Sequence, residues 1–264
     1  MNAILRTLAL TLLLTSALAC HTRPAVLEPV ALGDPVRTTH TSEATIAGTR
    51  LGYQLSLPDS KTAPADGWPL LLFFHGAGER GSQIDLVGRH GPLKYSSKFS
   101  ELRSAVIVAP QCPEDAWWDA DALMALVDEV RAAHPVDEDR VYITGLSMGG
   151  YATWDLLSRF PDVFAAAVPI CGGGDPRRLW EGISSSFEMD GLLRASHVPV
   201  RAFHGQDDRV VPVGESELLV DALEEVGSRA SLTIYPGVGH NSWAKTYANG
   251  ELYAWLFAQE RGAD

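Results

Sequence analysis

Short apolar runs alternate with amphipathic segments along the chain from residue 44 onward. Residues 44–48 and 50–57 are rich in alternating apolar and β-branched positions on either side of a Gly-containing turn, which predicts a β-hairpin. Compact apolar runs follow, each ended by Gly, Pro or His, and they are typical of buried strands: residues 70–74, 105–109, 141–144, 166–170, 200–203 and 231–235. Continuous runs of this kind are expected in a parallel sheet that is covered on both faces.

The segments between these runs have apolar residues at the spacing of an amphipathic helix. Positions 123, 126, 127 and 130 repeat at i, i+3, i+4 and i+7, with Asp119 or Asp121 as the N-cap. A second predicted helix has apolar positions 218, 219, 222, 223 and 226 on one side and stops at Gly227, and a last helix covers about 246–259. The pattern predicts an α/β fold, a doubly wound, mostly parallel eight-stranded sheet with helices on both faces. The crossovers leave no room for a large lid domain.

The first residues have the pattern of an export signal. Arg6 gives a positive start, Leu8–Leu14 an apolar stretch too short to span a bilayer, and Ala17–Ala19 a small-residue cleavage site. We expect residues 1–19 to be a signal peptide and residues 20–43 to be a flexible tether. Cys20 follows the cleavage site as in the lipobox of bacterial lipoproteins. Two outcomes stay open, a lipid anchor on Cys20 facing the periplasm or cell surface, and plain secretion.

Composition and charge narrow the class of protein. With 264 residues, 46% of them hydrophobic and 20% charged, the chain is typical of one soluble domain, here residues 44–264. A net charge of −12 argues against nucleic acid and against membrane contact other than the N-terminal anchor. No CxxC, HExxH, EF-hand or Gly-Lys-Ser pattern is present, so neither a metal nor another cofactor is implied. Cys112 and Cys171 could form a disulfide or remain two buried thiols.

The chemistry centres on Ser147. Residues 145–149 match the pattern G-x-S-x-G and lie between the strand at 141–144 and a helix expected to begin near Met148. The motif alone is a weak signal, but a strand-to-helix turn is the setting in which it exposes a serine hydroxyl above the sheet. We predict that Ser147 is the nucleophile and that the backbone N–H of Met148 is one donor of an oxyanion hole.

A serine hydroxyl needs a base, and three histidines follow Ser147 along the chain. His197 precedes a strand and would lie at the wrong end of the sheet. His204 ends the next strand and is predicted to be structural. His240 lies in a Gly-rich loop after the last strand, and this loop can reach the nucleophile. We therefore predict that His240 is the base.

Two further segments are expected at the same edge of the sheet. Residues 204–212 follow a predicted strand and contain two adjacent candidates for the acid of a triad, Asp207 and Asp208. Residues 75–81 follow the first buried strand, and their glycines let the backbone approach a ligand closely. A second oxyanion donor is expected in this loop.

Residues 75–81, 145–150, 204–212 and 239–240 together resemble the phospholipase/carboxylesterase-like and prolyl-oligopeptidase-like esterases of the α/β-hydrolase superfamily. The resemblance covers about residues 45–260 and implies the α/β-hydrolase fold. It places the acid on Asp208 and the second oxyanion donor on Ala77, with Gly76 as the next candidate. Gly76 is also expected to contact the substrate. His75 is then structural. Arg80 either pairs with Glu79 or binds a substrate carboxylate.

The expected activity is hydrolysis of a carboxylic ester through a Ser-His-Asp triad and an acyl-enzyme. The resemblance implies short-chain or carbohydrate-linked esters of the acetyl or feruloyl type. Trp117, Trp118 and Trp243 either line an acyl or sugar site or pack beneath a loop, whereas Trp154 is expected in the core. Two alternatives remain, a peptidase that lacks the propeller of prolyl oligopeptidases, and a lipid-anchored binding protein without activity.

Overall fold

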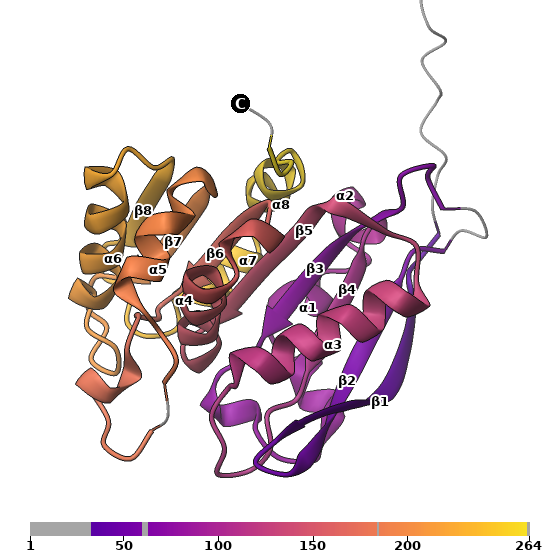
Figure 1. The fold of residues 1–264 in the computed structure, drawn as a ribbon, viewed down its shortest axis with the longest axis horizontal. Helices are drawn as coiled ribbons and strands as arrows, with labels where there is room; N and C mark the ends of the chain where they lie inside the picture. The colour runs from indigo at the N-terminus through magenta and orange to yellow at the C-terminus, as the bar shows by residue number, and fades with distance from the viewer. Residues whose placement is uncertain (1–32, 60–62, 184, 263–264) are drawn as a thin grey trace, which may run out of the picture. The chain divides into compact units, whose positions relative to one another are not determined.

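The computed structural model describes residues 33–59, 63–183 and 185–262. The predicted signal peptide, Cys20 and the first part of the predicted tether lie outside these residues. Within them, one sheet has the strand order β1-β2-β4-β3-β5-β6-β7-β8, and every pairing is parallel except the two made by β2 (Figure 1). The expected mostly parallel eight-stranded sheet is confirmed. The strands are β1 Val36–Ile46, β2 Thr49–Leu57, β3 Trp68–Phe74, β4 Val106–Pro110, β5 Val136–Leu146, β6 Ala166–Ile170, β7 Val200–Gly205 and β8 Ala230–Tyr235.

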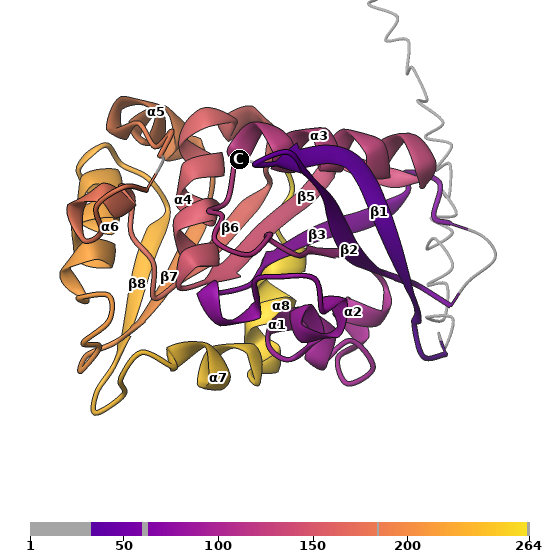
Figure 2. The same ribbon diagram turned by 90° about the horizontal axis from the view of Figure 1, so that it is seen from below.

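Helices cover both faces of this sheet, as expected. Alternate residues of a strand face opposite layers: in β3, Leu70 and Leu72 pack in the layer of α3, α4, α5 and α6, whereas Leu71 and Phe73 pack in the layer of α1, α2, α7 and α8. Figure 2 shows the two layers on opposite sides of the sheet. The helices are α1 Gly91–Lys94, α2 Ser100–Arg103, α3 Ala120–Ala133, α4 Met148–Arg159, α5 Met189–Arg194, α6 Gly214–Glu225, α7 Ser242–Tyr247 and α8 Gly250–Phe257.

The order of the strands sets the position of the site. From β3 the chain moves to β4, and α3 then carries it back to β5 on the other side of β3. This reversal places the carboxyl ends of β3 and β5 next to each other, which is where open α/β sheets bind ligands. In the part of the chain that the structure describes, every helix is too short or too polar to cross a membrane.

The first strand begins earlier than predicted. β1 starts at Val36, and residues 36–41 pair with residues 52–57 of β2. The expected tether is therefore wrong for residues 36–43. These residues form the edge of the sheet and are mostly polar. They therefore lack the apolar alternation from which a strand is predicted.

Two predicted helices also differ in detail. The helix expected over 246–259 is two helices, α7 and α8, because the chain turns at Asn249, whose side chain caps the N-terminus of α8. In α6, Leu219 and Leu223 are buried as predicted, but Leu218 is exposed, and so is Val226, the residue that follows the helix. For α3 the structure selects Asp119 as the N-cap.

Candidate active site

The turn between β5 and α4 holds Ser147 in a backbone conformation that residues other than glycine rarely adopt. Its φ is 52° and its ψ is −116°, and its N–H donates to the Ile170 carbonyl oxygen (2.9 Å). A Cβ on Gly145 would lie 2.1 Å from the Gly149 carbonyl oxygen, and a Cβ on Gly149 would lie 2.0 Å from the Phe74 carbonyl oxygen. The turn therefore needs both glycines of the motif, and the strain at Ser147 points to a functional position.

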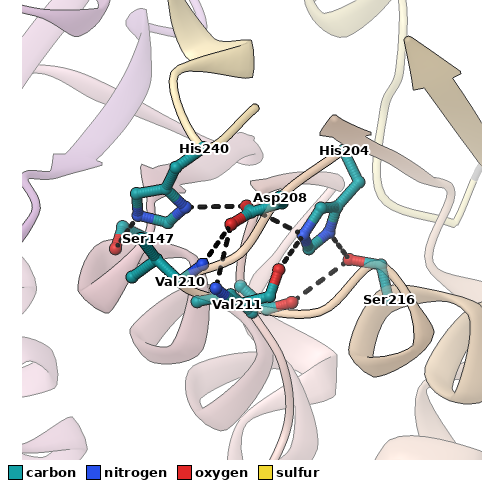
Figure 3. A network of polar contacts seen from close by, with 8 residues as sticks. Ser147, His204, Asp208, Val210, Val211, Ser216 and His240 are labelled. Carbon is teal, nitrogen blue, oxygen red and sulfur yellow. Dashed lines mark hydrogen bonds and ion pairs between the residues drawn. The ribbon is translucent and has the colours of Figure 1, made fainter. Parts of the chain in front are cut away.

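His240 and Asp208 lie beside Ser147 at the carboxyl edge of the sheet (Figure 3). The Ser147 Oγ is 2.8 Å from Nε2 of His240, and Nδ1 of His240 is 2.7 Å from Oδ2 of Asp208. The other candidate acid, Asp207, is exposed. The structure thus brings together the three side chains selected from the sequence. A carboxylate at Nδ1 favours the tautomer of His240 whose Nε2 can accept a proton from Ser147.

The Asp208 carboxyl group is buried and ionised. Burial opposes ionisation, but hydrogen bonds from His204 and His240 and from the backbone N–H groups of Val211 and Val210 hold the pKa of Asp208 well below its usual range. The two backbone groups donate to Oδ1 at 2.9 Å each. Asp208 therefore keeps its negative charge at neutral and mildly acidic pH.

Two backbone N–H groups beside Ser147 are placed to bind a negatively charged oxygen. Met148 is the first residue of α4, and Ala77 is the first residue of the short 3-10 helix η1 (Ala77–Glu79) that follows β3. Among the described residues, no backbone carbonyl accepts a hydrogen bond from either group. Ala77, Ser147 and Met148 line the same cavity. This arrangement has the features of an oxyanion hole at a helix N-terminus.

His75 and Trp118 hold the loop that carries Ala77. The Nδ1–H of His75 donates to the Gly76 carbonyl oxygen (2.6 Å), its Nε2 accepts from the Cys112 N–H (3.0 Å), and the Trp118 indole N–H donates to the His75 carbonyl oxygen (3.2 Å). Burial lowers the pKa of His75 to about 4, so its ring is neutral and can fill both roles. Because the Gly76 carbonyl and the Ala77 N–H share one peptide plane, fixing the first also orients the second.

A cavity of about 630 Å³ opens in front of Ser147. Trp117 and Trp180 form an aromatic wall, with ring centroids 5.9 Å apart, and both pack on Tyr151. The volume is in the range of sites that bind small organic ligands. The cavity lining also contains three charged residues, Arg80, Asp115 and Asp119.

The remaining substrate contacts predicted from the sequence differ in how they relate to this cavity. Trp118 lines it but is only 5% exposed, so its main contact is with the oxyanion loop. Gly76 is buried beneath Leu146, which lies 2.8 Å from the position of an added Cβ. Trp243 packs edge-on against His240, with ring centroids 5.3 Å apart. Trp243 therefore contacts the base rather than the aromatic wall.

Arg80 does not pair with Glu79. Its Nε and Nη1 donate to the carbonyl oxygens of Ala77 (3.2 Å) and Ala116 (3.0 Å), and within the described residues the side chain of Glu79 lies 3.7 Å from Nε2 of His90. The expectation of a pair between neighbouring residues is therefore wrong. Arg80 instead lies on the cavity wall, held by backbone oxygens.

Both described cysteines are free and buried, so Cys112 and Cys171 form no disulfide. Cys171 lies close to Asp208 and His240, and the three potential ligand atoms are all within 4.8 Å of one another. Burial raises the pKa of the Cys171 thiol to about 12, and the other two groups already bond to each other. A protonated thiol and a bonded pair are poor ligands, so these residues do not fit a resident metal ion.

Sequence reasoning missed part of the cavity wall, including its large apolar residues Trp180, Ile183 and Val210. Trp180 and Ile183 come from the long crossover between β6 and β7, and Val210 comes from the loop after β7. An aromatic residue in a crossover that leaves the carboxyl edge was a usable signal for Trp180. Val210 is 55% exposed in a polar loop and gave no signal.

The chain is similar to known ester hydrolases. A poly(3-hydroxyoctanoate) depolymerase from Pseudomonas fluorescens is 26% identical over an alignment of 269 positions that covers 92% of each chain. A solved thermostable esterase is 35% identical with a TM-score of 0.73, and the match covers 86% of this chain and 64% of that chain. This chain therefore spans less than two thirds of that esterase. A ferulic acid esterase, 17% identical with a TM-score of 0.64 over 85% of this chain and 98% of that chain, shares the fold.

The family comparison covers the segment that holds the site. Residues 111–254 match the dienelactone hydrolase family, and they include Ser147, Asp208 and His240. Together with the sheet topology and the esterase relatives, this match shows that the chain belongs to the dienelactone hydrolase family and is a serine esterase of the α/β-hydrolase fold.

Proposed function

We propose that this esterase hydrolyses short-chain or carbohydrate-linked carboxylic esters, with Ser147 as nucleophile, His240 as general base and Asp208 as the acid that orients His240. One observation carries the proposal. The three side chains form a continuous hydrogen-bonded series that ends in the cavity, next to two uncommitted N–H groups. This is the geometry required for acyl transfer to a serine.

In the first step, the Ser147 Oγ forms a bond to the carbonyl carbon of the ester while its proton passes to Nε2 of His240. The N–H groups of Ala77 and Met148 stabilise the negative carbonyl oxygen, and loss of one such donor typically costs about 3 kcal/mol of transition-state stabilisation. The bond from carbon to the alcohol oxygen then breaks. The alcohol takes the proton from His240 and leaves an acyl group on Ser147.

In the second step, a water molecule repeats the sequence on the acyl-enzyme. His240 accepts a proton from the water as its oxygen attacks the acyl carbon. The bond to the Ser147 Oγ breaks, and the proton returns to the serine. The products are a carboxylic acid and the restored enzyme. The fixed charge of Asp208 stabilises the protonated His240 in both steps.

The lining of the cavity supports the proposed substrate class. The faces of Trp117 and Trp180 can stack on a sugar or hydroxycinnamoyl ring. Arg80, Asp115 and Asp119 offer hydrogen-bond donors and acceptors that suit hydroxyl groups. A polyol or phenolic ester therefore meets both an aromatic platform and polar partners in one site.

A substrate panel tests this proposal. Purified protein is assayed on p-nitrophenyl esters from acetyl to octanoyl, on an acetylated xylo-oligosaccharide, on methyl ferulate and on peptide anilides, with Ser147→Ala as the control. We expect the highest kcat/KM on an acetyl or feruloyl ester and a loss of about 10⁴-fold or more in the variant. Hydrolysis of anilides but not esters would instead support a peptidase.

A poly(3-hydroxyalkanoate) is a second candidate substrate. The supporting observation is the similarity to the depolymerase from Pseudomonas fluorescens over 92% of both chains. Polymer suspensions distinguish the two candidates. Clearing of a poly(3-hydroxyoctanoate) suspension, without release of acetate from the acetylated sugar, would favour the polyester.

We also propose that the protein is exported through the leader at residues 1–19. The support is the order of Arg6, the apolar stretch and the small residues before Cys20. Mass analysis of the mature N-terminal peptide from a bacterial host tests this directly. A diacylglycerol-modified Cys20 indicates an anchor, an unmodified Cys20 at the new N-terminus indicates secretion, and a retained Met1 contradicts export.

A further inference from the structure

His204 lies on the far side of Asp208 from His240 (Figure 3). Its ring is fully buried. Its Nε2 is 3.0 Å from the Val211 carbonyl oxygen and 3.3 Å from Oδ2 of Asp208. Both oxygens are acceptors only, so Nε2 carries a hydrogen, and this hydrogen is shared between the two oxygens.

The other ring nitrogen connects His204 to the segment behind the nucleophile. Nδ1 is 2.8 Å from the Ser216 Oγ on α6, and this hydroxyl lies 3.1 Å from the Gly172 carbonyl oxygen in the loop after β6. The same loop begins after Ile170, whose carbonyl oxygen accepts the N–H of Ser147. His204 therefore joins the loop of the acid to the loop that supports the nucleophile.

The contact from His204 completes the hydrogen bonding of Asp208. The Asp208 side chain has no exposed surface, and a buried carboxylate is stable only when its oxygens are bonded. Oδ1 accepts the N–H groups of Val210 and Val211, while Oδ2 lies between His204 and His240. Donors on two sides of Oδ2 limit rotation of the carboxylate away from His240.

We propose that His204 is a positioning residue for ester hydrolysis and acts through Asp208. Its Nε2–H holds Oδ2 in line with Nδ1 of His240 and withdraws part of the negative charge from that oxygen. Without this donor, the carboxylate moves more freely and places more negative charge against His240. This inference rests on the proposed catalytic roles of Ser147, His240 and Asp208.

The surrounding groups restrict how a change at His204 can act. Asp208 faces the ring from its own loop and Ser216 faces it from α6. Next to them, the Glu215 carboxylate on α6 lies 3.6 Å from Nε of Arg178, and the Cys171 thiol lies near Asp208 and His240. Within the described part of the chain, Glu215, Arg178 and Cys171 form no bond to the His204 ring. A change in pH dependence would therefore be transmitted through Asp208.

Two variants separate positioning from packing. His204→Leu introduces an apolar side chain of similar bulk and removes the donor, whereas His204→Gln retains an N–H group. We expect His204→Leu to lower kcat on p-nitrophenyl acetate by about 30- to 100-fold with KM within about twofold. The acid limb of its kcat/KM profile should move to higher pH by about half a unit, because a less shared carboxylate stabilises the protonated, inactive base. His204→Gln should recover at least about tenfold of the lost kcat.

Controls exclude indirect effects. His197 is an exposed histidine just before the N-terminal end of β7, whereas His204 lies at the C-terminal end. His197→Gln is therefore the matched substitution and should leave kcat unchanged. Titration with a fluorophosphonate counts active sites, and kcat is expressed per labelled site so that misfolded protein does not enter the comparison.

The inference is overturned if His204→Leu keeps the wild-type kcat and acid limb. It is also overturned if both His204 variants lose the same activity with an unmoved acid limb, since this result indicates packing alone. Failure of the proposed function has a different signature, because the wild-type enzyme would then neither hydrolyse the ester nor take up the label.

Discussion

The carboxylate of Asp208 is stable inside the protein because polar groups contact both of its oxygens. Two backbone N–H groups hold Oδ1 and two histidines hold Oδ2. Charge-assisted hydrogen bonds of this kind favour the ionised form more strongly than burial disfavours it. Asp208 therefore offers His240 an acceptor that stays charged, and its exposed neighbour Asp207 has no such environment.

Replacing Asp208 by asparagine should reduce kcat by about 10³- to 10⁴-fold while KM changes little. The asparagine amide can donate to Nδ1 of His240, which favours the tautomer whose Nε2 cannot accept a proton. Steady-state kinetics on p-nitrophenyl acetate measure the effect. Asp207→Asn is the matched control and should stay within about twofold of wild type. A large loss in Asp207→Asn with an active Asp208→Asn would reverse the assignment.

The sequence identified some of these residues more directly than others. Ser147 and His240 follow from a turn motif, chain order and a Gly-rich loop, all of which are local signals. The choice of Asp208 over Asp207 needed the resemblance to a known loop pattern, because adjacent residues with the same side chain differ only in burial. The bonds of Arg80 to backbone oxygens of Ala77 and Ala116 could not be foreseen, since they depend on how two loops meet.

The helix α4 connects the nucleophile to the layers around it. Its first turn packs so closely on β3 that a Cβ on Gly149 would lie 2.0 Å from the Phe74 carbonyl oxygen. The same contact keeps the nucleophile turn next to the oxyanion loop that follows Phe74. Stability and geometry of the site therefore depend on the same glycine.

Gly149→Ala should lower the free energy of unfolding by about 2 kcal/mol or more, because backbone atoms must move apart to admit the methyl group. Urea unfolding followed by tryptophan fluorescence provides the measurement. Gly214→Ala is the comparison, since its added Cβ would meet nothing closer than 3.8 Å and α6 favours alanine. Equal stability of Gly149→Ala and wild type would show that the packing is looser than described.

The same helix anchors the crossover before α5 through Asp155. The Ser186 hydroxyl donates to its Oδ2 (2.7 Å), while its Oδ1 is buried and has no partner within the described residues. Burial raises the pKa of Asp155 to about 6, although the bond from Ser186 and the charge of Arg159 act in the opposite direction. The folded protein therefore binds this proton more tightly than the unfolded chain does, and ionised Asp155 lowers stability above about pH 6.

Asp155→Asn should consequently be more stable than wild type by about 1 kcal/mol at about pH 8, where the wild-type carboxylate is charged. The difference should disappear as the pH falls from about 6 to about 4, because the wild-type group is then neutral in the folded state. Urea midpoints at the two pH values test this. A variant that is equally destabilised at both would mean that hydrogen-bond geometry, not charge, dominates at this position.

Strands and helices differed in how well the sequence predicted them. The buried strands were found because their apolar runs need no partner to be recognised, and β6 has the predicted bounds. The polar first part of edge strand β1, residues 36–43, was missed because its own residues show no apolar alternation, and residues 36–41 are held by pairing with residues 52–57 of β2. The break between α7 and α8 was missed because both helices are apolar and one asparagine cap divides them.

At the level of the whole molecule, the parallel sheet brings four loops to one edge. The oxyanion loop follows β3, the nucleophile β5, the acid β7 and the base β8. Such an edge was predictable, since parallel strands must all end on one side of a sheet. The contact between Trp117 and Trp180 was not, because the two residues lie in different crossovers and meet only in the folded chain. The sequence therefore predicts the fold and the mechanism better than it predicts the substrate.

Removal of the aromatic wall should change substrate preference. Trp180→Ala should raise KM for methyl ferulate about tenfold, and more than for p-nitrophenyl acetate, because the larger acyl group loses a stacking surface. Trp180→Phe keeps an aromatic ring, and its KM for methyl ferulate should lie between those of Trp180→Ala and the wild type. Equal KM changes for the two esters would indicate that Trp180 supports the cavity without contacting the acyl group.

Covalent labelling of the nucleophile tests the assignment of Ser147 most directly. Folded protein is treated with a fluorophosphonate, its intact mass is measured, and the modified peptide is sequenced. We expect one adduct per chain, on Ser147, that is absent from Ser147→Ala and from urea-unfolded protein and forms more slowly in the presence of an ester substrate. An unlabelled folded wild type, or an adduct on a different residue, would contradict the assignment of Ser147.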